Sequence, residues 1–208
     1  YFGMRKIELA KGGKVQRLML NGKFVFQMGP LDQGFWPDGI YTAPTDEALR
    51  YDLEITKKLG FNTIRKHVKV EPERWYYWAD KLGILIWQDM PSGNNSKPES
   101  RKQFELELER MVLQHRNHPS IILWVVFNEG WGQYDTPRLT AWVKGMDPGR
   151  LVNNASGWTD EKAGDVIDMH NYPGPGSPKP EAKRAAVLGE FGGLGLKIDG
   201  HTWQKETW

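Results

Sequence analysis

The spacing of hydrophobic and polar positions changes along the chain and divides it into two parts. From Arg5 to Phe26 apolar residues alternate with polar ones, and Asn21-Gly22 interrupts the alternation. Alternation is typical of β-strands, and an Asn-Gly pair between alternating stretches is a strong hairpin signal. We therefore predict a short antiparallel β-ribbon that leads into a strand near Lys23–Met28. A loop rich in turn-forming residues follows, from Gly29 to Pro44.

Helical spacing begins at Thr45, which can cap a helix that Gly60 ends. Its predicted inward face consists of Ala48, Tyr51, Ile55 and Leu59. Further helices are expected from Pro72 to the residue before Gly83, over Glu99–Arg116 and over Pro137–Lys144. The strands between and after these helices are predicted at Phe61–His67, Ile84–Trp87, Ile121–Phe127, Leu151–Ala155, Asp165–Met169 and Ala185–Leu188.

Repeated helix–glycine–strand junctions indicate a parallel α/β fold. Lys58–Phe61 and Lys81–Ile84 are near copies of one another. Counted from Phe24, seven strands are predicted, whereas a closed (β/α)8 TIM barrel has eight and typically needs about 250 residues. Only 18 residues follow Glu190, too few for a further helix, strand and closing helix. The expected fold is an incomplete TIM barrel preceded by the antiparallel ribbon.

Composition narrows the range of partners. The 208 residues include 39% hydrophobic and 26% charged residues, which is ordinary for a globular domain. The net charge of +2 is dispersed without a basic run, so no nucleic-acid partner is expected. No apolar stretch approaches the roughly 20 residues of a membrane span, so no membrane partner is expected either. Cysteine is absent, which excludes disulfides, thiolate catalysis and cysteine-based zinc sites.

The candidate chemistry lies where the predicted strands end. Ile121–Phe127 is a continuous apolar run that ends in Asn128-Glu129, and Glu190 follows a later strand. In parallel α/β folds the carboxyl ends of the strands meet at one rim, where active sites open. Two facing carboxylates are what glycoside hydrolysis requires. A separation of about 5–5.5 Å would indicate retention of configuration, and about 6.5–9.5 Å would indicate inversion.

Other polar and aromatic side chains are predicted at the same rim. We expect Arg65 either to keep one glutamate ionised or to form a structural ion pair. His67 and His170 are equally suited to binding sugar hydroxyls and to structural roles. The remaining candidates at strand ends and in rim loops are Asp32, Asp89, Ser156, Tyr172, Trp36, Trp131 and Trp158, of which the tryptophans are expected to stack on sugars. By contrast, Trp75, Trp78 and Trp124 are expected in the core, and His115 and His118 at the end of the long helix are expected to position it.

Several motifs resemble glycoside hydrolase family 2, which contains β-galactosidases, β-glucuronidases and β-mannosidases. Asn117-His118-Pro119-Ser120-Ile121-Ile122-Leu123-Trp124 running into Asn128-Glu129 is similar to the family's acid/base signature. Further similar stretches are Leu20–Lys23, Thr63–His67, Tyr77–Asp80 and Leu188–Gly192. The resemblance implies retaining hydrolysis of a terminal β-linked sugar, without a cofactor or metal, from an oligosaccharide or glycoside. It further implies Glu129 as general acid/base, Glu190 as nucleophile, Asn128 on the sugar 2-hydroxyl, and Tyr172 holding the nucleophile.

The chain departs from the family pattern in three places. Members usually carry β-sandwich domains, of which residues 1–22 would be the remaining ribbon, with the partial catalytic barrel in residues 23–208. The family's eighth strand, which supplies a tryptophan floor, has no counterpart, and Leu31-Asp32-Gln33 stands where many members have a histidine. The edges of an open barrel predict self-association. A periplasmic or secreted location would suit a polysaccharide-degrading member, with any signal outside this chain.

Two other functions remain open at the level of the sequence. One is a catalytically inactive barrel fragment that acts only in carbohydrate binding or interaction. The other is a metal-dependent barrel hydrolase that uses His67, His170, Asp89 and a glutamate to hold zinc or manganese. The tight H-x-H and H-E-x-x-H ligand spacings are absent, which favours the glycosidase over the metal hydrolase.

Overall fold

The chain begins with a three-stranded antiparallel ribbon in the computed structural model, which describes all residues except 201, 203 and 208. The ribbon consists of β1 (Ile7–Gly12), β2 (Val15–Leu20) and β3 (Lys23–Phe24). Asn21 and Gly22 both have positive φ angles, 51° and 75°, as a tight hairpin turn between strands requires. The predicted ribbon is therefore confirmed. The predicted strand near Lys23–Met28 is wrong, because only two of its residues are extended and they pair antiparallel with β2.

The parallel strands form two groups. Five strands pair in chain order, and a parallel pair follows them. The five are β4 (Leu31–Asp32), β5 (Thr63–Lys66), β6 (Leu85–Asp89), β7 (Ile121–Asn128) and β8 (Leu151–Ser156), and the pair is β9 (Val166–Asn171) and β10 (Ala185–Phe191). The first parallel strand thus lies inside the segment predicted as a loop. Between β8 and β9 the Asp165 backbone N–H donates to the Val152 carbonyl oxygen at 2.8 Å, which keeps the two groups adjacent.

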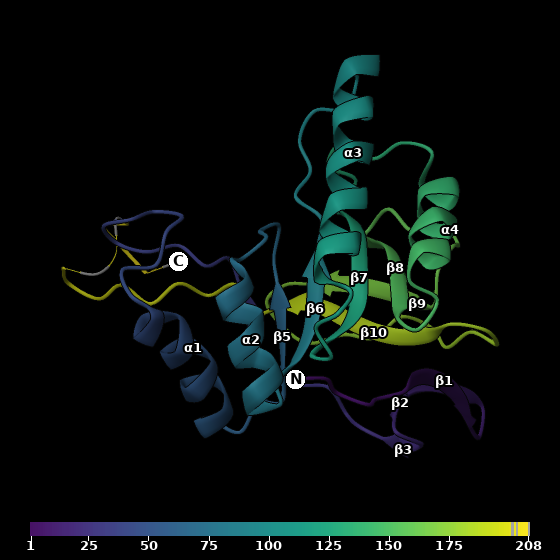
Figure 1. Ribbon diagram of the computed structural model, residues 1–208, viewed down its shortest axis with the longest axis horizontal. Coiled ribbons are helices and arrows are strands. Elements are labelled where there is room, and N and C mark those ends of the chain that lie inside the picture. The colour runs from purple at the N-terminus through teal and green to yellow at the C-terminus, as the bar shows by residue number, and fades with distance from the viewer. Residues whose placement is uncertain (201, 203, 208) are drawn as a thin grey trace.

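Four helices alternate with these strands, as the sequence predicted. They are α1 (Asp46–Lys58), α2 (Glu73–Leu82), α3 (Pro98–His115) and α4 (Thr136–Met146), and they cover the outer side of the strands (Figure 1). The Thr45 hydroxyl accepts the Ala48 N–H at 3.1 Å, and Gly83 ends α2 in a left-handed conformation. The arrangement is therefore a mostly parallel β/α fold. Within the described residues no ladder joins β10 to β4.

The predicted inward face of α1 is wrong. Its buried residues are Leu49, Leu53 and Thr56, whereas Tyr51 and Leu59 are exposed. Thr56 tolerates burial because its hydroxyl donates to the Asp52 carbonyl oxygen within the same helix, at 2.7 Å. Because Thr56 is polar, the buried series Leu49, Leu53 and Thr56 looked less hydrophobic than the predicted series, and the sequence pattern favoured the wrong face.

Two hydrophobic clusters lie on opposite sides of β7, whose eight residues are all buried. One cluster lies between the strands and the helices and includes Trp75 and Trp124, as predicted. The other includes Leu123 and the ribbon residue Ile7, so the ribbon packs against the second cluster, and in Figure 1 it lies below β9 and β10. Complete burial of each large apolar side chain contributes about 1.5–3 kcal/mol, which makes β7 the best anchored strand of the fold.

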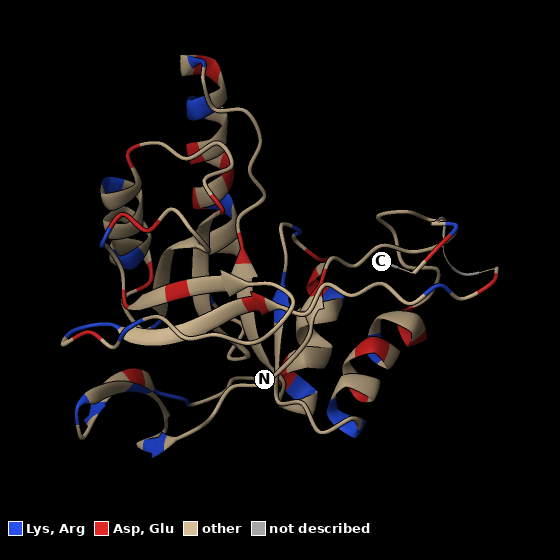
Figure 2. Cartoon of the chain, turned by 180° about the vertical axis from the view of Figure 1, so that it is seen from behind, with Lys and Arg blue, Asp and Glu red and all other residues tan. Residues whose placement is uncertain are grey.

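Charged side chains are distributed over all parts of the molecule. Lysines and arginines alternate with acidic residues along the helices and loops, without a continuous basic face in the view of Figure 2. Among the described residues, none of the helices combines the length and the apolarity that crossing a membrane requires.

Candidate active site

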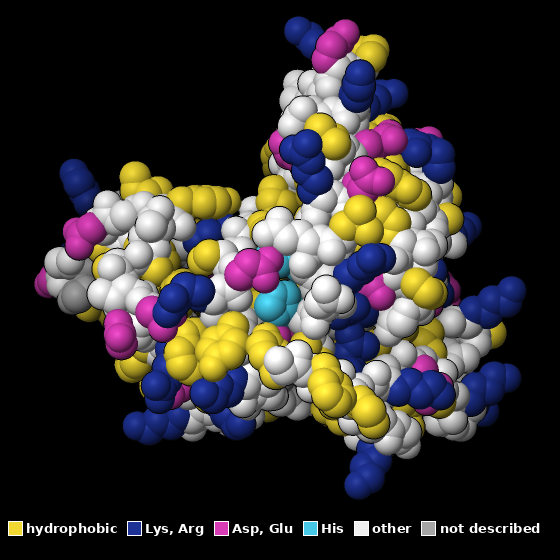
Figure 3. All heavy atoms as spheres, in the orientation of Figure 1, with side chains coloured by type: hydrophobic (Ala, Val, Ile, Leu, Met, Phe, Trp, Pro, Cys, Tyr) yellow, Lys and Arg dark blue, Asp and Glu magenta, His cyan; other side chains and the backbone are white. Residues whose placement is uncertain are grey.

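The carboxyl ends of β5, β7, β9 and β10 bring five predicted side chains together. They are Arg65, Asn128, Glu129, His170 and Glu190. In the space-filling view, histidine and acidic side chains lie together near the centre of the face (Figure 3). The rule that parallel strands end at a common rim predicted that these side chains lie together, and they do.

Glu129 stands where the chain turns sharply after β7. Its φ angle of 52° lies in the left-handed region, and Gly130 follows with a φ of 83°. The Glu129 backbone N–H donates to the Ser156 carbonyl oxygen at 2.8 Å, which fixes the turn against β8. A non-glycine residue in this conformation costs about 1–3 kcal/mol and is typical of functional sites, where the surrounding structure maintains it. The turn directs the carboxylate toward β9.

Glu190 is the more deeply buried of the two glutamates. Its Oε1 accepts a hydrogen bond from Arg65 Nη1 at 2.9 Å, and its Oε2 accepts one from the Tyr172 hydroxyl. Burial and then the hydrogen bond to Glu190 raise the pKa of Tyr172, so the phenol stays protonated and remains a donor. His67 Nε2 lies 3.4 Å from the same Oε1. The Glu190 carboxylate therefore has one cationic and one hydroxyl donor, with a histidine nitrogen nearby.

Arg65 joins the strand ends through a single buried guanidinium group. Its Nε and Nη2 donate to the two oxygens of Asp89 at 3.0 and 2.8 Å, and Nη2 also donates to Asn128 Oδ1 at 2.8 Å. Burial alone would lower the pKa of Arg65, but Asp89, Asp168 and Glu190 outweigh it and raise that pKa. Arg65 therefore remains positively charged beside Glu190.

His170 lies between the two glutamates. Its Nδ1 is 2.6 Å from Glu129 Oε1, and its Nε2 is 2.7 Å from the Ser156 hydroxyl and 3.3 Å from Arg65 Nη1. One carboxylate oxygen of Glu129, one of Glu190 and one nitrogen of His170 all lie within 4.8 Å of one another. Glu190 is therefore hydrogen-bonded to an arginine and Glu129 to a histidine, and the two carboxylates lie a few ångströms apart.

Asp168 is a site residue that the sequence analysis did not identify. It is buried within β9 and accepts hydrogen bonds from Ser156 Oγ at 2.5 Å, Asn153 Nδ2 at 2.7 Å and the Gly189 N–H at 2.6 Å. Burial raises the pKa of Asp168, although Arg65 and the hydroxyl of Ser156 oppose that rise. An acidic residue in an otherwise apolar strand was the available signal. A Cβ on Gly189 would lie 2.5 Å from the Asp168 carboxylate, so this close approach requires glycine.

Trp158 and His67 flank the glutamates. The Trp158 ring is 60% exposed, and its centroid lies 5.4 Å from the His170 ring and 6.5 Å from the Tyr172 ring. His67 Nδ1 is 3.0 Å from Gln33 Nε2, while its buried Nε2 has no hydrogen-bond partner. Burial lowers the pKa of His67, so its ring favours the neutral form. Trp158 therefore offers an exposed ring near His170 and Tyr172, whereas His67 is buried against Glu190.

Two predicted site residues make their contacts elsewhere. The Asp32 carboxylate accepts hydrogen bonds from Lys66 Nζ at 2.6 Å and from the Gly34 N–H at 2.8 Å. Trp36 is half-buried and packs against the helix-side core cluster. Neither side chain is hydrogen-bonded to the glutamate pair within the described part of the chain.

The metal-ligand set considered from the sequence is not assembled, because Arg65 occupies both oxygens of Asp89. Glu129, His170 and Glu190 do offer three ligand atoms within 4.8 Å. However, Arg65 already supplies a positive charge 2.9 Å from Glu190, and a second cation beside it would be repelled. The geometry therefore favours acid–base and nucleophilic chemistry by the two carboxylates.

Comparisons with known proteins agree on one family. The family model described as glycosyl hydrolases family 2, TIM barrel domain, matches residues 16–182. A β-galactosidase of Vibrio vulnificus strain YJ016 is 29% identical over 174 residues, which are 79% of this chain and 16% of that protein. The chain thus spans about a sixth of the length of the curated relatives it matches.

Solved structures give the same result. The β-glucuronidase of Parabacteroides merdae superposes with a TM-score of 0.72 at 25% identity, covering 83% of this chain and 23% of that one. β-Glucuronidase 2 of Bacteroides uniformis, solved covalently bound to cyclophellitol-6-carboxylate aziridine, superposes with a TM-score of 0.71 at 25% identity. That match covers 84% of this chain and 24% of the other.

Proposed function

Because the chain belongs to glycosyl hydrolase family 2, we propose that it hydrolyses a terminal β-linked sugar with retention of configuration. Glu129 serves as general acid/base and Glu190 as nucleophile. The observation that carries the proposal is the pair of carboxylates within 4.8 Å, one held by Arg65 and the other by His170. An approach of two carboxylate oxygens to within 4.8 Å supports the short separation of about 5–5.5 Å in retaining enzymes over the about 6.5–9.5 Å of inverting ones.

The reaction proceeds in two displacements. In the first, a Glu190 oxygen forms a bond to the anomeric carbon while the bond to the leaving oxygen breaks, and Glu129 gives its proton to that oxygen. In the second, Glu129 takes a proton from water, whose oxygen attacks the anomeric carbon and releases Glu190. The cycle returns both glutamates to their starting protonation states, with the sugar and the alcohol as products.

The surroundings of the two glutamates suit these different roles. Glu190 must be charged to attack, and Arg65 and the Tyr172 hydroxyl both stabilise its charged form. Glu129 must hold a proton and later accept one, and its close partner is the imidazole of His170. Two carboxylates in unlike environments are the usual basis for dividing acid and nucleophile roles within one site.

The sugar is expected to occupy the space beside the pair. Asn128 Oδ1 is held by Arg65, which leaves the Asn128 amide N–H₂ to donate to a 2-hydroxyl. His67 stays a prediction for another hydroxyl, since its Nε2 is buried 3.4 Å from Glu190 Oε1, and the exposed Trp158 ring offers a flat surface for stacking. Asp32 and Trp36 stay predictions for contacts farther along the substrate.

A mechanism-based label tests the nucleophile directly. We expect 2-deoxy-2-fluoro-β-glycosides with a dinitrophenolate leaving group to label this chain on Glu190, as read by mass spectrometry of peptides. Glu190→Gln should abolish the label. Glu129→Gln should still be labelled, because this leaving group needs no proton, yet it should lose turnover of poor leaving groups by about 10²–10⁴-fold. The exposed Glu161→Gln is the matched control and should behave like the wild type.

The same reagents separate the proposal from its alternative. The panel should contain β-galactosides, β-glucuronides and β-mannosides, since the relatives that the chain resembles differ in their sugar. Labelling of a residue other than Glu190 would refute the assigned roles. If calorimetry shows that a saccharide binds but no sugar gives labelling or turnover, the proposal of an enzyme is wrong and a non-catalytic carbohydrate-binding barrel takes its place.

A further inference from the structure

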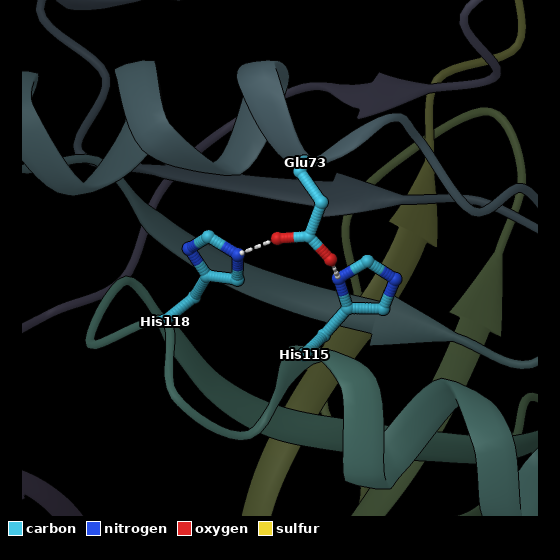
Figure 4. Close-up of side chains that lie close together, drawn as sticks. All are labelled: Glu73, His115 and His118. Atoms are coloured by element: carbon cyan, nitrogen blue, oxygen red, sulfur yellow. Dashed lines mark hydrogen bonds and ion pairs between the residues drawn. The ribbon is translucent and has the colours of Figure 1, made fainter.

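A second cluster of histidines and carboxylates lies between α2 and α3, outside the glutamate site (Figure 4). Glu73 is the first residue of α2, His115 is the last residue of α3, and His118 lies in the turn before β7. The eight residues of β7 separate His118 from Glu129. We propose that Glu73, His115 and His118 bind a divalent transition-metal ion of the zinc class.

The three side chains point at a common position. His118 Nε2 lies 2.7 Å from Glu73 Oε2, and His115 Nδ1 lies 3.3 Å from Glu73 Oε1. In Figure 4 the carboxylate stands between the two imidazole rings, one oxygen toward each. One ligand atom from each residue lies within 4.8 Å of the other two. Zinc bonds of about 2.0–2.2 Å to nitrogen and oxygen require only small shifts of these side chains, in which Glu73 and His118 move slightly apart.

His118 has the additional partner that metal-binding histidines usually have. Its Nδ1 lies 2.6 Å from Asp80 Oδ2 and its Nε2 lies 2.7 Å from Glu73 Oε2, so an ion bound at Nε2 would take the place of a proton there while Asp80 keeps the Nδ1 proton. Asp80 is itself held by the Ser120 N–H at 2.9 Å and by the Tyr1 hydroxyl at 2.6 Å. A carboxylate–histidine pair of this kind fixes the ring orientation and makes the ligand nitrogen more basic.

His115 distinguishes a metal site from a simple ion pair. A protonated His118 between Glu73 and Asp80 would be satisfied without any ion. Yet the His115 side chain is only 1% exposed, and its Nδ1 has no hydrogen-bond partner although it points at Glu73. Leaving a buried polar atom unpaired costs about 1–3 kcal/mol, and a metal bond would remove that cost.

The ligand set indicates which ions fit. Two imidazole nitrogens and one carboxylate suit zinc, cobalt or nickel, whereas magnesium and calcium prefer oxygen ligands only. The Glu73 side chain is 52% exposed, so it can rotate to admit the ion and leaves room for a water as fourth ligand. The buried His115 ring is held by Tyr76, with ring centroids 4.5 Å apart, and needs no movement. A bound ion would join α2 to the end of α3.

Metal binding to the purified chain tests the proposal without reference to its enzymatic activity. We expect one equivalent of Zn²⁺ bound at this cluster by calorimetry, a raised melting temperature with Zn²⁺, and the visible spectrum of four-coordinate Co²⁺. Glu73→Gln should weaken Zn²⁺ binding at least tenfold and remove the thermal shift, and because Glu73 is half-exposed this variant should fold. His115→Asn should have the same effect, with folding verified by circular dichroism.

Glu129→Gln is the matched control, because it removes a ligand from the other cluster of two carboxylates and a histidine. It should keep the equivalent that Glu73→Gln loses. Equal Zn²⁺ binding by the wild type and Glu73→Gln would overturn the proposal, and so would loss of the ion in Glu129→Gln alone. Absence of any Zn²⁺ binding by the wild-type chain would reduce the cluster to an ion pair.

Discussion

At the scale of single residues, Arg65 is the side chain on which the glutamate site depends. Its guanidinium contacts Asp89, Asn128 and Glu190, on three different strands. The Coulomb attraction inside a protein offsets the desolvation of such charges only while the partners remain together. Removing the arginine would leave two buried carboxylates without their counter-ion.

We therefore predict that Arg65→Met lowers the free energy of unfolding by about 3–5 kcal/mol. Urea denaturation followed by tryptophan fluorescence would measure the change. The matched control is Arg138→Met, because Arg138 also pairs with two carboxylates, of Glu105 and Asp135, but is 48% exposed. Exposed pairs contribute about 0–1 kcal/mol, so equal losses in the two variants would contradict the role assigned to burial.

Single residues were predictable where they lie at the carboxyl end of a strand and not where they lie in its middle. Glu129 directly follows β7 and Glu190 is the next-to-last residue of β10, and a carboxylate at the end of an apolar run was the signal for both. Asp168 was not predicted because it is a buried residue in the middle of β9. Hydrophobic spacing alone gives no reason to assign a functional role to a polar residue at such a position. Trp36 was expected at the site, but side-chain direction within an irregular loop depends on packing that spacing does not encode.

At the scale of elements, the start of β10 is held in place by one arginine. Arg184 donates to both oxygens of Asp160, at 2.6 and 2.9 Å, and to both of Glu181, at 2.7 and 2.8 Å. Asp160 lies in the connection between β8 and β9 and also accepts from Asn154 Nδ2 at 2.9 Å. This network links β8, the β8–β9 connection and the start of β10. It therefore helps to fix the position of β10, which carries Glu190.

The network predicts a stability difference that depends on pH. Burial alone would raise the pKa of Asp160, but hydrogen bonds from Arg184 and Asn154 outweigh it and lower that pKa below the 3.8 of an ordinary aspartate. A lowered folded-state pKa stabilises the protein above pH 3.8, and the gain is lost as the pH falls through the folded-state value. Asp160→Asn should cost about 1.5–3 kcal/mol at pH 6 and progressively less below pH 3.8.

Urea unfolding of both proteins between pH 6 and pH 2.5 would measure this convergence. The exposed Asp199→Asn serves as the control and should change the unfolding free energy by no more than about 0.5 kcal/mol at either pH. A constant difference between Asp160→Asn and the wild type over this range would show that the carboxylate charge is not involved.

The ends of the helices were predictable from their capping and terminating residues, whereas the buried side of a helix was predicted less well from hydrophobic spacing. Thr45, Gly60, Pro72 and Gly83 located the ends of α1 and α2 to within a residue or two, because caps act through local backbone chemistry. The first parallel strand was misplaced because β4 contains only two residues. Its pairing comes from the neighbouring β5, through a contact distant in the sequence that local alternation does not reveal.

At the scale of the whole molecule, the order of the parallel strands was predictable, whereas the incomplete barrel stays a prediction that rests on the number of residues after Glu190. The alternation of helices and strands fixes a parallel arrangement, because each crossover returns the chain to the same edge. Closure depends on whether the last strand reaches the first, and no pattern within either strand reports that distance. In the part of the chain that the structure describes, β4 and β10 each pair on one side only.

These two strand edges lead to a prediction about assembly. Unpaired edges offer backbone donors and acceptors to another chain, and apolar side chains lie exposed beside them at Phe26, Leu31 and Phe191. We predict that the chain self-associates as its concentration rises, so that sedimentation velocity gives an average mass above the 23.9 kDa of one chain. A mass of 23.9 kDa at every concentration would contradict the prediction.

A lysine substitution locates the surface responsible. Leu31 is 38% exposed in β4, and a lysine on a strand edge opposes pairing because its charge would have to be desolvated. Leu31→Lys should therefore lower the average mass toward that of one chain while leaving the circular dichroism spectrum unchanged. Leu59→Lys introduces the same charge at an exposed apolar position after α1, away from both edges, and should leave association as it is. If both substitutions weaken association equally, general charge repulsion is the cause and the β4 edge has no special part in it.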